Sequence, residues 1–192
     1  IGTYPYTEVS SRTVYMHRLP VDRADALVAW EEYRQDQELS AAEWTMRGGA
    51  IDLEVGRTGS RSLRCSKDDP AAWTGASQDV MVNQQEAEPV TISGRLRAQD
   101  VTGAGDREIS LYGDVLLQSG EWLFGQIAPF ETGTHDWQQA SWTVDAEQPI
   151  QMVRLHCLFR AGHTGTVWFD DVAVTTASAP ERNLVLNPSF EE

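Results

Sequence analysis

The chain has 192 residues, and its 15 Lys and Arg against 29 Asp and Glu give a formal net charge of −14 at pH 7. This length suits one large domain with an extension, and the acidity argues against binding to nucleic acid or to anionic membranes, which both favour clustered positive charge. No run approaches the roughly 20 apolar residues of a membrane span, so we expect neither nucleic acid nor membrane insertion. The acidity suits a secreted, highly soluble protein and a site for a hard cation.

Residues 1–43 form an N-terminal extension that contains the one predicted helix. Asp22 can cap this helix after Pro20, and Leu27, Trp30 and Tyr33 recur at helical spacing. The opposite side of the helix is charged, as is typical of a face in contact with water. Nothing in this extension predicts a site.

From Trp44 onward, short runs of β-prone residues are separated by Gly, Asp and Ser, which is typical of a β-sandwich. Helices do not alternate with these runs, so a parallel sheet is not expected. Residues 44–176 are predicted to be all-β, a two-sheet antiparallel jelly-roll sandwich that follows one short N-terminal helix. The nine predicted strands are Ala50–Val55, Ser62–Ser66, Ala76–Val82, Val90–Ala98, Glu108–Leu117, Trp122–Ala128, Gln138–Val144, Met152–Arg160 and Thr166–Val174.

The last of these strands loses its alternation in the middle. Phe169 and Val172 both favour the buried face, but they are three residues apart, so the period of two fails at Asp170 and Asp171. We therefore predict a β-bulge there, which would direct one carboxylate toward the interior. A buried ionised carboxylate needs compensation, and a bound cation is the simplest kind.

Two cysteines, Cys65 and Cys157, fit no zinc-binding or redox spacing. Each lies on the apolar side of a predicted strand. Two readings stay open: buried core thiols, or a disulfide between the two strands, which would suit an oxidising compartment.

Several short motifs follow one another along residues 44–176. They are Trp44…Gly49-Ala50, Thr58-Gly-Ser-Arg-Ser-Leu-Arg64, Gln78-Asp-Val, Val90-Thr-Ile-Ser-Gly94, Thr134-His-Asp-Trp137 and Gly165-Thr-Val-Trp-Phe-Asp-Asp-Val172. In this order they resemble the carbohydrate-binding modules of the galactose-binding-like β-sandwich type, families four, nine and sixteen and their relatives. The resemblance implies a non-catalytic jelly roll within a large secreted, usually bacterial, polysaccharide-acting or cell-surface protein, and it implies one structural calcium ion.

The family usually opens with the motif Asn-Leu-x-x-Asn-x-x-Phe-Glu, which this chain carries near its C-terminus, from Asn183 to Glu191. Residues 177–192 are therefore predicted to be a linker and an opening-strand motif. The motif either folds back as the missing first strand of the module or begins a tandem module.

The resemblance also implies a ligand set for the calcium ion. By position, the ligands are the carboxylates of Asp171 and Glu191 and the backbone carbonyls near Gly59 and Arg61. All are oxygen donors, which suit Ca²⁺, and the ion would join the first strand, the turn and the last strand. The alternative is that the carboxylates form ion pairs with arginines, namely Arg57, Arg61 or Arg64.

Strand alternation predicts a sugar-binding face. If the strands near 90–98, 108–117 and 122–128 are neighbours, their outward side chains share one concave sheet, while Leu123 and Ile127 face the core. An aromatic ring can stack on a pyranose while polar groups bind its hydroxyls. The predicted carbohydrate-binding residues are Trp73, Gln78, Arg95, Arg97, Tyr112, Asp114, Trp122 and Gln126. The alternatives are packing roles for the two tryptophans and a solvated ladder of the arginines with Asp114 and Glu108.

No catalytic arrangement stands out. The four histidines are scattered, no Gly-x-Ser-x-Gly motif is present, and neighbouring acids on one strand make a poor glycosidase pair. The sequence therefore predicts that the protein is not an enzyme. It predicts a calcium-stabilised carbohydrate-binding module that targets a larger secreted protein to a polysaccharide or oligosaccharide, with neighbouring domains of that protein as further partners. The alternative is a structural or interaction sandwich of a multi-domain surface protein without a glycan site.

Overall fold

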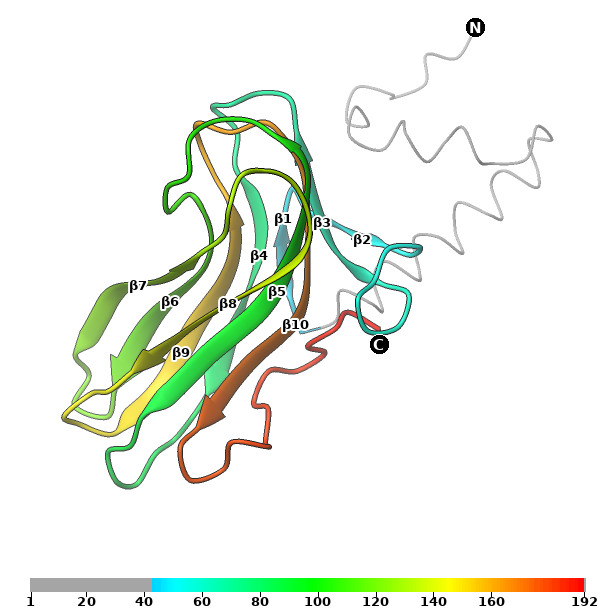
Figure 1. Ribbon diagram of the computed structural model, residues 1–192. Coiled ribbons are helices and arrows are strands. Elements are labelled where there is room, and N and C mark those ends of the chain that lie inside the picture. The colour runs from blue at the N-terminus through cyan, green and yellow to red at the C-terminus, as the bar shows by residue number, and fades with distance from the viewer. Residues whose placement is uncertain (1–42, 192) are drawn as a thin grey trace, which may run out of the picture. The chain divides into compact units, whose positions relative to one another are not determined.

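Two antiparallel β-sheets of five strands pack face to face in the computed structural model, which describes residues 43–191 (Figure 1). The first sheet has the order β1-β4-β9-β6-β7, and the second has the order β2-β3-β10-β5-β8. The strands are β1 (Thr45–Arg47), β2 (Ala50–Asp52), β3 (Ser62–Lys67), β4 (Thr74–Met81), β5 (Val90–Val101), β6 (Ile109–Leu117), β7 (Trp122–Pro129), β8 (Gly133–Val144), β9 (Ile150–Phe159) and β10 (Gly165–Thr176).

The predicted all-β, two-sheet antiparallel sandwich is confirmed, although one strand was not predicted and several strand bounds differ by a few residues. The three-residue strand β1 was not predicted, because so short a run carries no alternation to recognise. Strand β8 begins at Gly133, five residues before the predicted start, because its first four residues carry no apolar side chain and show no alternation. The predicted helix near residues 20–39 lies outside the described residues.

Apolar side chains from both sheets meet between the layers and form one core. Successive residues of β9 alternate between buried Val153, Leu155 and Cys157 and more exposed Arg154 and His156. Cys157 and its counterpart Cys65 are fully buried free thiols. The reading of the cysteines as core thiols is therefore confirmed.

The predicted bulge in the last strand is confirmed. The pairing between β10 and β5 shifts its register between Asp170 and Ala173, and Asp171 adopts a left-handed backbone conformation with φ of 49°. The bulge turns Asp170 into the protein, where it is fully buried, and returns Val172 and Val174 to the core side.

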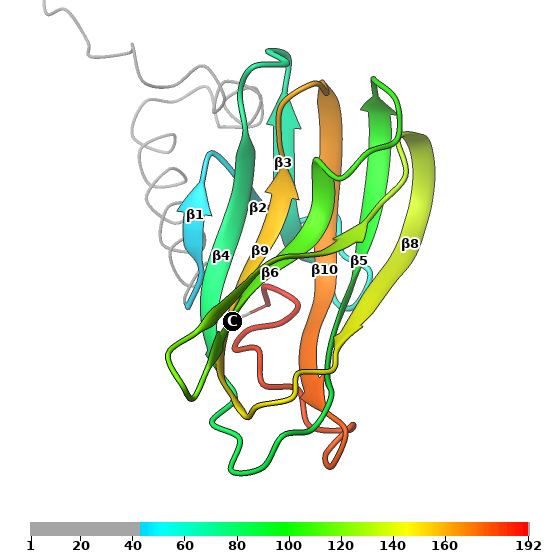
Figure 2. The same ribbon diagram turned by 90° about the vertical axis from the view of Figure 1, so that its left-hand side faces the viewer.

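Residues 183–191, here called the C-terminal segment, run back along the sandwich after β10 (Figures 1 and 2). They belong to the same compact unit as the sandwich. Leu184 donates a backbone hydrogen bond to Val174, and Val172 donates one to Pro188. The side chain of Asn183 bonds to the backbone of both Val172 and Val174. The segment thus lies against the end of β10 without forming a strand of its own.

Within residues 43–191 the structure has no helix of the length and apolarity needed to cross a lipid bilayer.

Candidate functional site

The side of the first sheet that faces away from the core carries a cluster of aromatic and charged residues. We call it the outer face, and Figure 2 looks toward it. Pairing across the strands places its members in rows, with Asp79 and Asp114 on either side of Arg154 and with Ser77 and Tyr112 on either side of His156. The outer face comprises Ser77, Asp79, Tyr112, Asp114, Trp122, Phe124, Arg154 and His156.

Two aromatic rings stand at the β7 edge of the outer face. The rings of Trp122 and Phe124 are stacked, with centroids 5.9 Å apart and an interplanar angle of 9°. The side chain of Phe124 is 67% exposed. The guanidinium of Arg154 lies 5.5 Å from the Trp122 ring, close enough for a cation–π contact. Asp79 holds this guanidinium through two hydrogen bonds of 2.7 and 2.9 Å, which fixes its orientation.

A second aromatic pair lies in the middle of the sheet. The Tyr112 ring meets the His156 ring edge to face, with centroids 5.7 Å apart. Burial lowers the pKa of His156 below 6.5, so the imidazole is neutral at pH 7. Burial and a hydrogen bond to Asp114 raise the pKa of Tyr112, so the hydroxyl stays protonated and donates to that carboxylate. In this part of the face, the uncharged imidazole of His156 and hydroxyl of Tyr112 can form hydrogen bonds beside the Tyr112 ring.

Of the predicted sugar-binding residues, Tyr112, Asp114 and Trp122 lie together on the outer face. Sequence reasoning missed Arg154, Asp79, His156 and the role of Phe124. The outward parity of β9 would have identified Arg154 and His156, but it could not show that β9 lies beside β6. Only the fold brings the two strands together.

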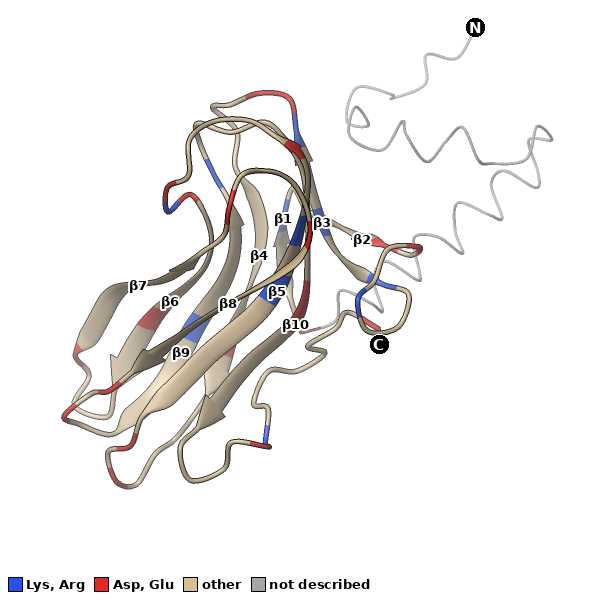
Figure 3. Ribbon diagram, in the orientation of Figure 1, with Lys and Arg blue, Asp and Glu red and all other residues tan. Residues whose placement is uncertain are grey.

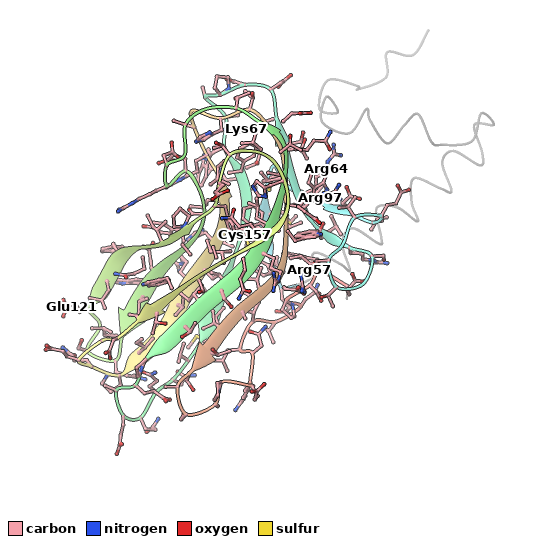
Figure 4. The ribbon with its side chains drawn as sticks, in the orientation of Figure 1. Arg57, Arg64, Lys67, Arg97, Glu121 and Cys157 are labelled. Atoms are coloured by element: carbon pink, nitrogen blue, oxygen red, sulfur yellow. The ribbon has the colours of Figure 1, made fainter. Side chains whose placement is uncertain are left out.

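Arg95 and Arg97 are not part of this face, and the expectation that β5 shares a sheet with β6 is wrong. Strand β5 belongs to the second sheet, because the chain crosses from one layer to the other between β5 and β6. Arg95 bonds to the Gln139 side chain at 3.0 Å. Arg97 lies 5.5 Å from the Trp168 ring, and Figure 4 shows it near Arg64, across β10.

A bulge in β7 changes which of its residues face outward. Gly125 adopts a φ of 74°, and the pairing with β6 shifts its register between Gly113 and Val115. Beyond the bulge, Ile127 pairs with Tyr112 and so faces outward, whereas Gln126 pairs with Gly113 on the inner side. The predicted core position of Ile127 and outward position of Gln126 are therefore wrong.

Gln78 and Trp73 are not part of the outer face. The Gln78 side chain is buried and bonds to the backbone N–H and C=O of Leu186 in the C-terminal segment. It therefore faces the interior side of β4. Trp73 is 38% exposed, and the Arg47 guanidinium covers its ring at 3.2 Å from the centroid. A ligand would need to displace this arginine to stack on Trp73.

The loop at residues 57–61, between β2 and β3, binds two carboxylates through its backbone. Asp170 accepts hydrogen bonds from the N–H groups of Arg57 and Thr58 at 2.6 and 3.1 Å, and from its neighbour Asp171. The Glu191 carboxylate accepts hydrogen bonds from the N–H groups of Ser60 and Arg61, at 2.9 and 2.7 Å. Burial raises the pKa of Asp170 to about 6, against the opposing effect of its amide donors.

The donors in this corner do not fit a calcium ion. Backbone N–H groups point at the carboxylates of Asp170 and Glu191, whereas Ca²⁺ needs oxygen ligands directed at one point. The Asp171 carboxylate contacts the guanidinium of Arg57, and among residues 43–191 no group of three or more His, Cys, Asp or Glu could hold a metal ion. Calcium binding through Asp171, Glu191 and the carbonyls near Gly59 and Arg61 stays a prediction, and this arrangement of donors favours its alternative, the ion pair of Asp171 with Arg57.

Charges of both signs are distributed over the described residues (Figure 3). Several basic residues lie beside acidic partners, such as Arg154 with Asp79 and Arg160 with Glu108. Within residues 43–191 the acidic residues are therefore not gathered on a single surface.

Comparison with curated proteins finds relatives that are named as nucleases. The chain is 25% identical over 169 residues to the tRNA nuclease WapA of Bacillus subtilis strain 168, a match that covers 85% of this chain and 7% of that protein. It is 29% identical over 150 residues to the tRNA3(Ser)-specific nuclease WapA of Bacillus spizizenii, covering 75% of this chain and 6% of that protein. The chain thus spans less than a tenth of the length of these relatives. No family model matches it.

Comparison with solved structures finds carbohydrate-binding modules. The CBM22-1 xylan-binding domain of Xyn10C from Paenibacillus barcinonensis superposes with a TM-score of 0.50 at 20% identity, over 73% of this chain and 90% of that domain. The C-terminal family 22 carbohydrate-binding module of Clostridium thermocellum Xyn10B gives a TM-score of 0.52 at 17% identity, over 72% and 87% of the two chains. These similarities show the fold, which is the jelly roll that carbohydrate-binding modules use.

Two predictions about function are corrected by the named relatives. We predicted a non-catalytic module that targets a secreted protein to a polysaccharide, and we predicted that the protein is not an enzyme. Both are wrong, because the curated relatives that match most of this chain are tRNA nucleases. The prediction failed because motifs of the sandwich report its fold, and a fold alone does not specify a function.

Proposed function

We propose that this chain is a segment of a large tRNA nuclease, in which the sandwich provides a ligand-binding face. The observation that carries the proposal is the match to two tRNA nucleases over 75–85% of this chain. The match occupies only 6–7% of those proteins, so tRNA cleavage is proposed for the whole polypeptide to which the chain would belong.

A cleavage assay tests this proposal. The product of the complete gene that encodes this chain is incubated with total tRNA, and the RNA is resolved on a denaturing gel. We expect discrete tRNA fragments whose formation depends on enzyme concentration. If the complete product leaves all tRNA intact under conditions in which it is folded, the proposed nuclease function is wrong.

For the sandwich itself, we propose that the outer face of the first sheet binds a carbohydrate. The stacked, exposed rings of Trp122 and Phe124 offer a flat apolar surface for the C–H face of a sugar. Arg154 is held in place beside them by Asp79, and a fixed guanidinium with a carboxylate partner can bind adjacent hydroxyls. The same fold is used by a xylan-binding domain and by a family 22 carbohydrate-binding module, which supports this ligand class.

Affinity electrophoresis of the purified chain in gels that contain soluble xylan tests the carbohydrate. We expect the wild-type chain to be retarded and the Trp122→Ala variant to migrate as it does in a gel without glycan. The matched control is Arg97→Ala, which removes a cation–π contact with a tryptophan on the second sheet and should retain the retardation. Equal migration of the wild type with and without every glycan tried would refute a sugar-binding outer face without bearing on tRNA cleavage.

A further inference from the structure

The C-terminal segment is bound to the sandwich in the way that a protein binds an extended peptide. The backbone of Leu186 forms a pair of hydrogen bonds with the Gln78 side chain, which accepts from its N–H at 2.8 Å and donates to its C=O at 2.9 Å. The Trp44 indole N–H donates to the C=O of Asn187 at 3.0 Å. Side chains of the sandwich thus form hydrogen bonds to the backbone of the segment at two successive residues.

Apolar side chains anchor the same segment. Phe190 is fully buried, and its ring lies 5.0 Å from that of Trp44. Val185 is 5% exposed, whereas Leu186 between these anchors is 56% exposed. This alternation of buried and exposed positions is typical of a peptide that lies on a surface with pockets for some of its side chains.

A third set of contacts holds the end of the segment. The Glu191 carboxylate accepts two backbone hydrogen bonds from the loop at 57–61. A Cβ atom at Gly59 would clash with that carboxylate, and Gly59 has a positive φ of 75°, so the loop favours glycine at this position. The surface that receives the segment therefore has three parts, from Trp44 with Gln78 of β4, from β10, and from this loop.

The connection between β10 and the segment contributes little to this binding. Most of residues 177–182 are exposed. Their hydrogen bonds lie within the connection and its junction with β10, or go to the neighbouring turn, where Ala177 donates to the C=O of Pro89 and Ser178 bonds to the Glu88 carboxylate. The segment is thus recognised by contacts that do not depend on the covalent link.

We propose that the surface formed by Trp44, Gln78, the end of β10 and the loop at 57–61 is a peptide-binding site that accepts this segment from a second copy of the chain as well as from the chain that carries the site. Every contact named above is the same whichever copy donates the segment, which is the condition for segment swapping. The short link gives the chain's own segment an effective concentration of the order of millimolar. The intramolecular arrangement therefore prevails until the link is cut or opened.

Exchange after cleavage of the link tests the proposal on the full chain. A protease recognition sequence is inserted between Pro180 and Glu181, the purified protein is cut, and a fluorescein-labelled peptide of residues 181–192 is added. We expect the cut chain to take up the peptide, as followed by fluorescence anisotropy, and the uncut chain to take up none at micromolar concentration. A peptide with Phe190→Ala should bind about a hundredfold more weakly or worse, while one with Leu186→Ala should bind like the wild type.

Two outcomes of the peptide experiment support the site. Uptake that depends on Phe190 supports the site, and so does recovery of the native circular dichroism by peptide if the cut chain has unfolded. Three outcomes would each overturn the proposal. They are a folded cut chain that takes up no peptide, equal binding of the Phe190→Ala peptide, and an unfolded cut chain that excess peptide does not restore.

A second experiment tests exchange between copies. A Phe190→Ala chain has an intact site, and a Gln78→Ala chain has an intact segment, so light scattering of their mixture should show a heterodimer that neither variant forms alone. A mixture that contains only monomers would overturn this part of the proposal.

Discussion

Replacement of Phe190 by alanine should strongly destabilise the sandwich, although the residue lies almost at the end of the chain. Its side chain is fully buried and packs on the Trp44 ring at 5.0 Å. Truncation of a buried phenylalanine costs about 3–5 kcal/mol through lost burial and the cavity that remains. For a domain of this size, each kcal/mol lowers the melting temperature by about 2–4 °C. We therefore expect a decrease of roughly 6–20 °C.

The assay is thermal and urea unfolding of the 192-residue chain, followed by tryptophan fluorescence. The matched control is Leu186→Ala on the same segment, whose side chain is 56% exposed and should change the free energy of unfolding by no more than about 0.5 kcal/mol. If Phe190→Ala behaves like this control, the C-terminal segment does not stabilise the sandwich, and the account of its docking is refuted.

Three further predictions concern the corner at β10 and the core thiols. Because the pKa of Asp170 is raised from 3.8 to about 6, the folded chain binds a proton more readily than the unfolded chain between these values. Asp170 therefore contributes less stability as the pH rises from about 4 to about 6. Urea unfolding across this range should show the wild type losing stability relative to Asp170→Asn, and a constant difference would contradict the shift. EDTA and millimolar calcium chloride should leave the melting temperature unchanged, because Arg57 already contacts the Asp171 carboxylate, whereas stabilisation by calcium would establish the cation site. Burial raises the pKa of Cys65 to about 12 and that of Cys157 well above 9. Ellman's reagent should therefore modify neither thiol at pH 8 until urea unfolds the chain, and rapid labelling of the native protein would contradict their burial.

The sandwich could be predicted because alternation is local and the core residues obey it. Strand β6, for example, places Ile109, Leu111 and Val115 inward, as their spacing indicates. The bulge at Asp170 could also be predicted, since valines beyond it resume the buried face with the wrong spacing. In both cases the signal lies within a few residues of the feature that it predicts.

The candidate site could be predicted only in part because it depends on which strands are neighbours. The outward positions of Arg95 and Tyr112 were both read correctly, yet the two residues lie on different sheets. Alternation says which side of a strand a residue takes, but it says nothing of the layer to which the strand belongs. The second failure has another cause: Gly125 introduces a bulge within β7, and the residues after it, from Gln126, exchange faces.

The loop at 57–61 explains why a segment at the far end of the chain belongs to the same fold. Its backbone N–H groups bind Asp170, from the bulge of β10, and Glu191, from the C-terminal segment. A bulge that buries a carboxylate needs donors to compensate it, and the N–H groups of Arg57, Thr58, Ser60 and Arg61 need acceptors. The two requirements are met together only when the C-terminal segment is docked, since Glu191 supplies the acceptor for the second half of the loop. Glu191, at the end of the opening-strand motif, therefore completes the hydrogen bonding of a loop that also binds Asp170 at the bulge. This arrangement requires that the three parts are close in space, and it does not depend on their order along the chain.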